Sequence, residues 1–177
     1  MTARSNIGVD VVRRWSECLP PGSTVVDVGC GSGVPISAAL IARGFRVFGI
    51  DASPTLVSAF RQRFPQAEVA CESAEGSRFF DRKFDGAVAI GLLFLLPATD
   101  QLEVIERVAS ALEAGGRFLF TAPREACEWN DMLTGQPSLS LGMDEYRRIL
   151  ERAGMQLRGS YVDEGENHYF DAAKTGA

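Results

Sequence analysis

Short apolar runs alternate along this chain with longer stretches in which apolar residues recur at helical spacing. The runs are rich in valine, isoleucine and phenylalanine, which predicts buried strands. Strands that alternate with helices are typical of an α/β fold, in which helices cover a mostly parallel sheet. In chain order the predicted strands span residues 25–28, 46–50, 68–70, 84–90 and 117–121.

Three stretches carry a clear helical pattern. The first covers residues 1–20, with one apolar face formed by Ile7, Val11, Trp15 and Leu19. The second precedes the fifth strand and is predicted to end at the pair Gly115 and Gly116. Its apolar positions are Leu102, Ile105, Val108, Ala109 and Leu112. The third lies near residues 144–153.

The first strand leads through an acidic residue, Asp27, into a glycine-rich loop. Gly29, Gly31 and Gly33 stand at every second position, just before a helix predicted to begin near Pro35. Glycines so placed allow a tight turn and let a ligand touch the backbone, while the helix start offers free N–H groups. The loop therefore predicts a site for a nucleoside cofactor.

The loop alone leaves two kinds of cofactor open. The dinucleotide fingerprint G-x-G-x-x-G needs glycine at position 34, where this chain has Val34. Asp51, at the end of the second strand, suits either kind because a carboxylate accepts two hydrogen bonds from a ribose diol. A nicotinamide oxidoreductase is therefore one alternative, although its half-domain would continue with parallel strand–helix units.

The order D-x-G-x-G-x-G over residues 27–33 resembles the first motif of class I S-adenosylmethionine-dependent methyltransferases, and the resemblance extends over about residues 24–174. It implies S-adenosylmethionine as cofactor and S-adenosylhomocysteine as product. In that family Asp27 would lie near the cationic amino group of the methionine moiety. Asp51 would bind the ribose, and Glu72 would accept from the adenine amino group. The other implied cofactor contacts are Gly29, Cys30, Gly31, Gly33, Ala52, Ser73 and Ile90.

The end of the chain is also similar to this family. Two extended runs, 155–162 and 168–173, are separated by a polar turn at 163–166. Such a pair would close a seven-stranded, mostly parallel sheet with an antiparallel last strand, in a Rossmann-like three-layer sandwich. The implied activity is in-line transfer of a methyl group to a small-molecule acceptor. A non-catalytic S-adenosylmethionine-binding sensor or regulatory module is the other alternative.

Candidates for the acceptor side follow the fourth and fifth strands. Many small-molecule relatives carry histidine after the fourth strand, where this chain has Phe94 and Leu95. Segment 123–142 is long for a connector and is interpreted as a substrate loop or lid, in which Trp129 could stack on an acceptor. His168, the only histidine, is interpreted either as a catalytic general base or as a group hydrogen-bonded within the terminal hairpin.

Composition narrows the function classes. With 177 residues and 46% hydrophobic content, the chain is predicted to be a single domain over residues 1–177 that binds its acceptor beside the cofactor. A net charge of −5 disfavours nucleic acid as a partner. Residues 1–10 lack an apolar export segment and the apolar stretch 86–98 is too short to span a bilayer, which predicts a cytoplasmic enzyme with no membrane partner. Four cysteines without C-x-x-C spacing, and one histidine, argue against a metal site.

Overall fold

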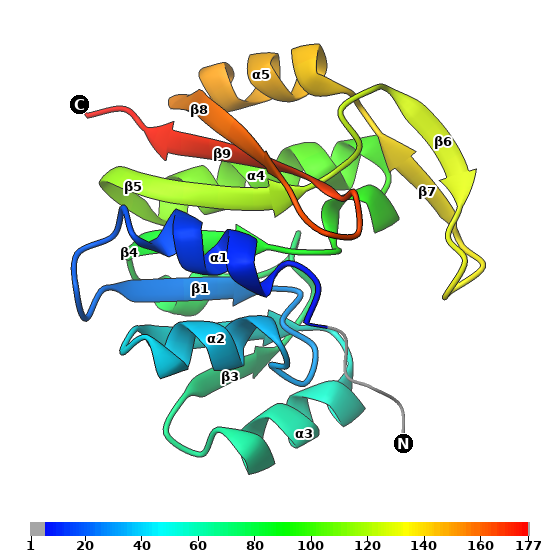
Figure 1. Cartoon of the computed structure of the whole chain (residues 1–177). Coiled ribbons are helices and arrows are strands. Elements are labelled where there is room, and N and C mark those ends of the chain that lie inside the picture. The colour runs from blue at the N-terminus through cyan, green and yellow to red at the C-terminus, as the bar shows by residue number, and fades with distance from the viewer. Residues whose placement is uncertain (1–5, 177) are drawn as a thin grey trace.

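The computed structural model describes residues 6–176, which are organised around one seven-stranded sheet (Figure 1). The strands from β3 to β5 are mutually parallel, whereas β9 runs antiparallel to both of its neighbours. This arrangement confirms the predicted α/β fold with an antiparallel last strand. Across the sheet the order is β3 (Glu68–Cys71), β2 (Arg46–Asp51), β1 (Thr24–Val28), β4 (Phe84–Ala89), β5 (Leu112–Thr121), β9 (His168–Lys174) and β8 (Met155–Val162).

Helices cover both faces of this sheet and complete the three layers. Successive strand residues point to opposite faces. Val25 accordingly belongs to the apolar cluster that contains Trp15 and Leu40 of the front helices, whereas Val26 belongs to the cluster that contains Val104 and Ile149 of the back helices. None of the helices within residues 6–176 is both long and apolar enough to cross a bilayer. The front helices are α1 (Val9–Ser16), α2 (Ile36–Ala42) and α3 (Pro54–Arg63), and the back helices are α4 (Ala98–Ala111) and α5 (Met143–Arg152).

The junction between α4 and β5 differs from its prediction. The sequence predicts a helix that continues to Gly115–Gly116 and a strand that starts only afterwards, and both statements are wrong because β5 already begins at Leu112. The backbone of Leu112 is extended and pairs with Phe84 of β4, so strand pairing ends the helix early. Gly115 and Gly116 instead lie within β5, at a point where its pairing with β4 is irregular. A Cβ on Gly116 would lie 2.9 Å from the carbonyl oxygen of Glu113.

The amino-terminal helix is shorter than predicted. Residues 1–5 of the expected span lie outside the described part of the chain. Ile7 precedes α1 and is 44% exposed, so the prediction that it joins the buried helix face is wrong. Gly8 has a left-handed backbone (φ +84°) and forms the cap, which is why the helix begins after it. The other predicted positions of that face are buried, namely Val11, Trp15 and Leu19.

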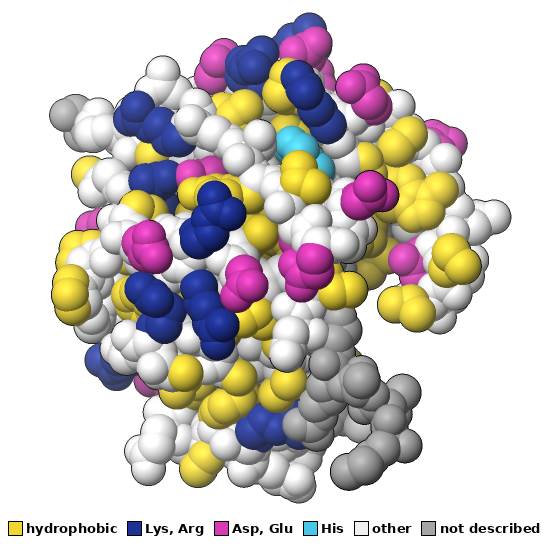
Figure 2. All heavy atoms as spheres, in the orientation of Figure 1, with side chains coloured by type: hydrophobic (Ala, Val, Ile, Leu, Met, Phe, Trp, Pro, Cys, Tyr) yellow, Lys and Arg dark blue, Asp and Glu magenta, His cyan; other side chains and the backbone are white. Residues whose placement is uncertain are grey.

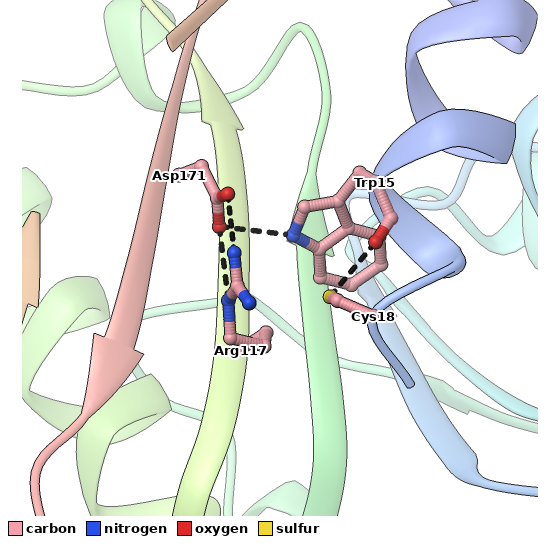
Figure 3. A network of polar contacts seen from close by, with 4 residues as sticks. All are labelled: Trp15, Cys18, Arg117 and Asp171. Carbon is pink, nitrogen blue, oxygen red and sulfur yellow. Dashed lines mark hydrogen bonds and ion pairs between the residues drawn. The ribbon is translucent and has the colours of Figure 1, made fainter. Parts of the chain in front are cut away.

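A polar network fastens α1 to the antiparallel half of the sheet (Figure 3). The indole N–H of Trp15 donates to Asp171 Oδ1 of β9 over 3.2 Å. Arg117 of β5 donates to both carboxylate oxygens of Asp171, so the buried charge has a bidentate partner. The network therefore stabilises the packing of three elements that are far apart in the sequence.

Segment 123–142 contains a β-hairpin that the sequence pattern did not reveal. The hairpin projects from the body of the molecule beside the carboxyl end of β5 (Figure 1). The Asp131 carboxylate accepts hydrogen bonds from the backbone N–H groups of Leu133 and Thr134, which forms the turn. Met132 and Leu133 at the tip are 98% and 97% exposed. The two antiparallel strands are β6 (Cys127–Asn130) and β7 (Pro137–Ser140).

Candidate functional site

The predicted cofactor residues come together at the carboxyl edge of the parallel strands. In the register of the sheet, Val28 of β1 pairs with Ile50 of β2, and Asp51 of β2 pairs with Cys71 of β3. The loops that follow these strands therefore lie side by side. Open α/β sheets bind their ligands at this edge.

The three loop glycines all have left-handed backbones, with φ of +75°, +54° and +82° for Gly29, Gly31 and Gly33. Gly33 is packed closely, since a Cβ there would lie 2.5 Å from Phe64. Gly29 is covered by Leu92, whose side chain would lie 3.2 Å from a Cβ. At Gly31 the nearest atom would be Cδ1 of Leu56, 3.9 Å away, which is an ordinary van der Waals distance, so this position is the least crowded of the three. Gly31 is therefore the position at which a ligand can approach the backbone.

Asp51 ties the glycine loop to the end of β2. Its Oδ2 accepts from the backbone N–H of Gly31 and its Oδ1 from that of Ser53, each over 2.9 Å. A carboxylate has about four acceptor sites. Each oxygen of Asp51 therefore keeps capacity for a hydroxyl group of a ligand.

Asp27 lies beneath the loop and is only 2% exposed. Its Oδ2 accepts from the hydroxyl of Ser37 in α2 over 2.6 Å. Burial raises the pKa of Asp27 from 3.8 to about 7, against the Ser37 hydrogen bond that lowers it, and the nearby charge of Asp51 adds to the rise. A cationic ligand group beside Asp27 would favour its ionised form.

Glu72 follows β3 and is anchored at both ends. Its backbone N–H donates to the carbonyl oxygen of Asp51 over 3.0 Å, and its Oε1 accepts from Ser77 Oγ. Within residues 6–176, Oε2 has no hydrogen-bond partner and can accept from a ligand. The remaining implied contacts differ in exposure, with Ala52 exposed, Ser73 and Ile90 half-buried, and Cys30 buried.

Cys30 behaves as a packing residue in this loop. It is 8% exposed, and burial raises the pKa of its thiol well above the ordinary value, with the charges of Asp27 and Asp51 adding to the rise. A thiol with a raised pKa is a poor nucleophile. Among residues 6–176, no three His, Cys, Asp or Glu side chains converge to hold a metal ion.

The candidate acceptor residues also meet, in a cleft of about 480 Å³ next to the end of β5. Phe94, Trp129 and His168 all line it, although they are up to 74 residues apart in the chain (168 − 94). The Phe94 and Trp129 ring centroids are 5.5 Å apart. Apolar side chains gather over the projecting hairpin, and the surface is recessed between the hairpin and the body (Figure 2). The other lining residues are Thr121, Ala122, Pro123, Arg124, Glu125, Asp131, Glu166 and Asn167.

His168 begins β9 and pairs with Val162 of β8. Its Nδ1 is shielded from solvent and has no hydrogen-bond partner within the described residues. Burial lowers the pKa of the imidazole below 6.5, as does the charge of Arg124, while a backbone hydrogen bond at Ala122 opposes the shift. The ring is therefore neutral at physiological pH and able to accept a proton.

Sequence reasoning missed several cleft residues. Thr121 Oγ1 accepts from the backbone N–H of Gly91 over 2.7 Å and so connects the loop after β4 to the cleft. Glu166 belongs to the turn at 163–166, which the sequence predicts only as a connection between two strands, and Asn167 directly follows that turn. The sequence offers one signal for these two residues, since they immediately precede the single histidine of the chain.

The fold and the carboxyl-edge site define an α/β domain of the nucleoside-cofactor-binding class. A family model described as "Methyltransferase domain" matches residues 25–116, which is more than half of the chain. The chain therefore belongs to the methyltransferase domain family, as its resemblance to class I enzymes implies.

Curated proteins with similar sequences and solved structures with similar folds include several methyltransferases. A ribosomal protein L11 methyltransferase of Symbiobacterium thermophilum is 33% identical over 107 residues, covering 60% of this chain and 34% of that protein. A ubiquinone biosynthesis O-methyltransferase of Xanthomonas campestris pv. campestris is 34% identical over 110 residues, covering 59% and 45%. The chain thus matches less than half the length of either protein.

A solved structure, magnesium protoporphyrin IX methyltransferase from Synechocystis PCC 6803 with bound S-adenosylmethionine, has a TM-score of 0.74 and 20% identity to this chain. The alignment covers 94% of this chain and 78% of that one. At this identity the similarity is one of fold, and it agrees with the Rossmann-like three-layer sandwich.

Proposed function

We propose that this domain is an S-adenosylmethionine-dependent methyltransferase that acts on a small molecule. The observation that carries the proposal is the placement of a glycine-and-acid site and an aromatic cleft at one edge of the sheet. The hydrogen bond between Gly91 and Thr121 connects the two. Family membership supports the reaction class.

The residues at the edge fit the parts of S-adenosylmethionine. The free acceptor capacity of Asp51 suits the two ribose hydroxyls, and Oε2 of Glu72 suits the adenine amino group. Asp27 would be ionised by the positively charged methionine moiety. Gly31 leaves the space that such a ligand needs next to the backbone.

Methyl transfer from S-adenosylmethionine requires few catalytic side chains. When bound, the cofactor supplies an electrophilic methyl carbon, which bonds to the acceptor lone pair while the carbon–sulfur electron pair stays on sulfur, giving S-adenosylhomocysteine. Phe94 and Trp129 would hold the acceptor and exclude water. The neutral imidazole of His168 would receive a proton that leaves the acceptor.

We also propose that residues 1–177 act as one domain in the cytoplasm, with segment 123–142 as part of the acceptor site. The cleft residues Arg124, Glu125, Trp129 and Asp131 support the role of this segment. The net charge of −5 supports a small molecule rather than nucleic acid as the acceptor.

A labelling experiment tests this function. The full chain is incubated with methyl-labelled S-adenosylmethionine and a cell extract, and label is counted in the small-molecule fraction and in the precipitated protein and nucleic acid. The proposal expects label in the small molecules, and little with the Asp51→Ala variant. Label in the precipitate would overturn the small-molecule assignment. Label in neither fraction would instead favour a non-catalytic binding module.

A further inference from the structure

We propose that the acceptor is a planar aromatic molecule that carries a positive charge. This inference rests on the proposed function, because it names the class of compound that would occupy the cleft beside the cofactor. It follows from the aromatic wall of the cleft, the charges on its rim and the way in which that rim is held.

The wall is formed by Phe94 and Trp129, which are both half-buried and therefore keep exposed ring surface. Their planes are tilted by 42° and their centroids are 5.5 Å apart, so the rings are in contact and leave no slot between them. A ligand ring must stack on the outer surface of the pair. Aromatic faces carry partial negative charge and attract cations as well as other rings.

The rim carries more negative than positive charge. Three acidic residues line the cleft, Glu125, Asp131 and Glu166, against one basic residue, Arg124. Glu125 and Glu166 form no side-chain hydrogen bond or ion pair with any residue in the range 6–176, so their charges remain available to a ligand. Asp131 differs, because its carboxylate is used by the turn of the hairpin.

Glu166 lies in a turn whose conformation is held by hydrogen bonds to the buried carboxylate of Asp163. Asp163, 8% exposed, accepts from the backbone N–H groups of Gly165 and Asn167 and from the hydroxyl of Tyr169. Glu166 itself has a left-handed backbone with φ of +61°, which is rare for residues other than glycine. The turn is thus fixed before a ligand arrives, and it places Glu166 and His168 on the same cleft.

An anionic acceptor fits this rim poorly. Arg124 is the only cationic side chain of the lining and would pair with one negative group, but two unpaired carboxylates on the same cleft would repel that group. A cationic acceptor gains from both carboxylates and from the aromatic faces. The neutral His168 does not oppose it.

Three indoles of similar size test the proposal. Tryptamine carries an ammonium group, tryptophol a hydroxyl group and indole-3-acetate a carboxylate. Their affinities for the full chain saturated with S-adenosylhomocysteine are measured by calorimetric titration. Tryptamine is expected to bind at least about tenfold more tightly than indole-3-acetate, with tryptophol between them. Equal affinities, a preference for the anion, or no binding of any of the three would overturn the proposal.

Charge variants then test whether the preference for tryptamine comes from the charged residues on the rim of the cleft. Glu125→Gln and Glu166→Gln should each reduce the ratio of tryptamine to indole-3-acetate affinity by about threefold or more, and Arg124→Gln should increase it. Glu164→Gln is the matched control, since Glu164 lies in the same turn, is exposed and does not line the cleft. If Glu164→Gln changes the ratio as much as Glu166→Gln, the preference reflects the overall charge of the protein and the proposal fails.

Two failures can be separated by measuring S-adenosylhomocysteine binding first. A chain that does not bind it contradicts the proposed function, and the indole series on the unliganded chain then tests the cleft by itself. A chain that binds it but does not prefer tryptamine contradicts only the present inference.

Discussion

The proposed cofactor edge and the proposed acceptor cleft are neighbours, but they are built in different ways. The cofactor edge uses loops that directly follow strands, and much of its binding surface is backbone. The cleft is assembled from the end of β5, a projecting hairpin and the turn before β9, and it depends on side chains. The comparison indicates that changes at the edge should alter cofactor affinity or folding, whereas changes in the cleft should alter acceptor binding or turnover and leave cofactor affinity unchanged.

His168→Gln is the variant for which we expect the largest difference between the effect on turnover and the effect on cofactor affinity. Loss of the neutral base should reduce kcat by about 10²-fold or more, as for other general bases. Because burial lowers the pKa of His168 below 6.5, the wild-type rate should rise with pH through that lowered value and be flat above it. Steady-state rates across pH check both statements, with the acceptor found by labelling.

The control for this variant is cofactor binding. S-adenosylhomocysteine affinity and melting temperature should be unchanged in His168→Gln. A parallel loss of all three properties would mean that the histidine holds the terminal hairpin together instead.

Asp27→Asn should separate stability from binding at the cofactor edge. The folded-state pKa of about 7 lies above the ordinary pKa of 3.8 for an aspartate, so the folded protein binds the proton more tightly than the unfolded chain. Its contribution to stability is therefore present at low pH and is lost as pH rises from about 4 to 7, by up to about 4 kcal/mol. The free energy of unfolding, measured by urea titration across this range, should fall for the wild type and be flatter for the variant.

The same variant should bind S-adenosylhomocysteine more weakly at pH 8, where the wild-type carboxylate is ionised. A variant that is more stable but binds as tightly as the wild type would exclude Asp27 from the cofactor site.

Two glycines of the loop form a matched pair. Gly33→Ala should destabilise the fold by about 2–3 kcal/mol, because its Cβ would lie 2.5 Å from Phe64 on a left-handed backbone. Gly31→Ala meets nothing closer than 3.9 Å and should cost only about 1 kcal/mol of stability, while its new methyl group hinders the ligand. Urea unfolding and cofactor titration of both variants test the assignment, which fails if Gly31→Ala binds normally.

Asp51→Ala should cost about 1–3 kcal/mol of cofactor affinity, from unpaired ribose hydroxyls. Asp85→Ala is its control at the opposite edge of the sheet, where Asp85 Oδ2 accepts from the backbone N–H of Thr24 over 2.8 Å. Each variant loses a carboxylate that binds backbone, so both should lose some stability. Only Asp51→Ala should lose affinity, and equal affinities in the two variants would contradict the ribose assignment.

The same contrast explains what the sequence could predict. The glycine loop and Asp51 could be predicted as site residues because their spacing is local and the proposed chemistry requires those residue types. The end of α4 could not be predicted in this way, because it is set by the pairing of Leu112 with Phe84, two residues from separate strands. The order of apolar and polar residues along the chain does not show such a tertiary contact.

The hairpin of segment 123–142 lacked a readable pattern for a related reason. Its buried positions include Ser138 and Ser140, polar residues that give no apolar alternation. Phe94, Trp129 and His168 could be proposed one at a time, but only the fold brings them to one cleft. Glu125 and Glu166 could not be recognised as candidate site residues until the fold placed them on the same cleft.

The most direct test of the account is calorimetric titration of the full chain with S-adenosylhomocysteine and, separately, with NADH. Micromolar binding of S-adenosylhomocysteine without binding of NADH is the predicted result. Binding of NADH alone would contradict the cofactor assignment and favour an oxidoreductase, and binding of neither would contradict a preformed site at the carboxyl edge of the sheet.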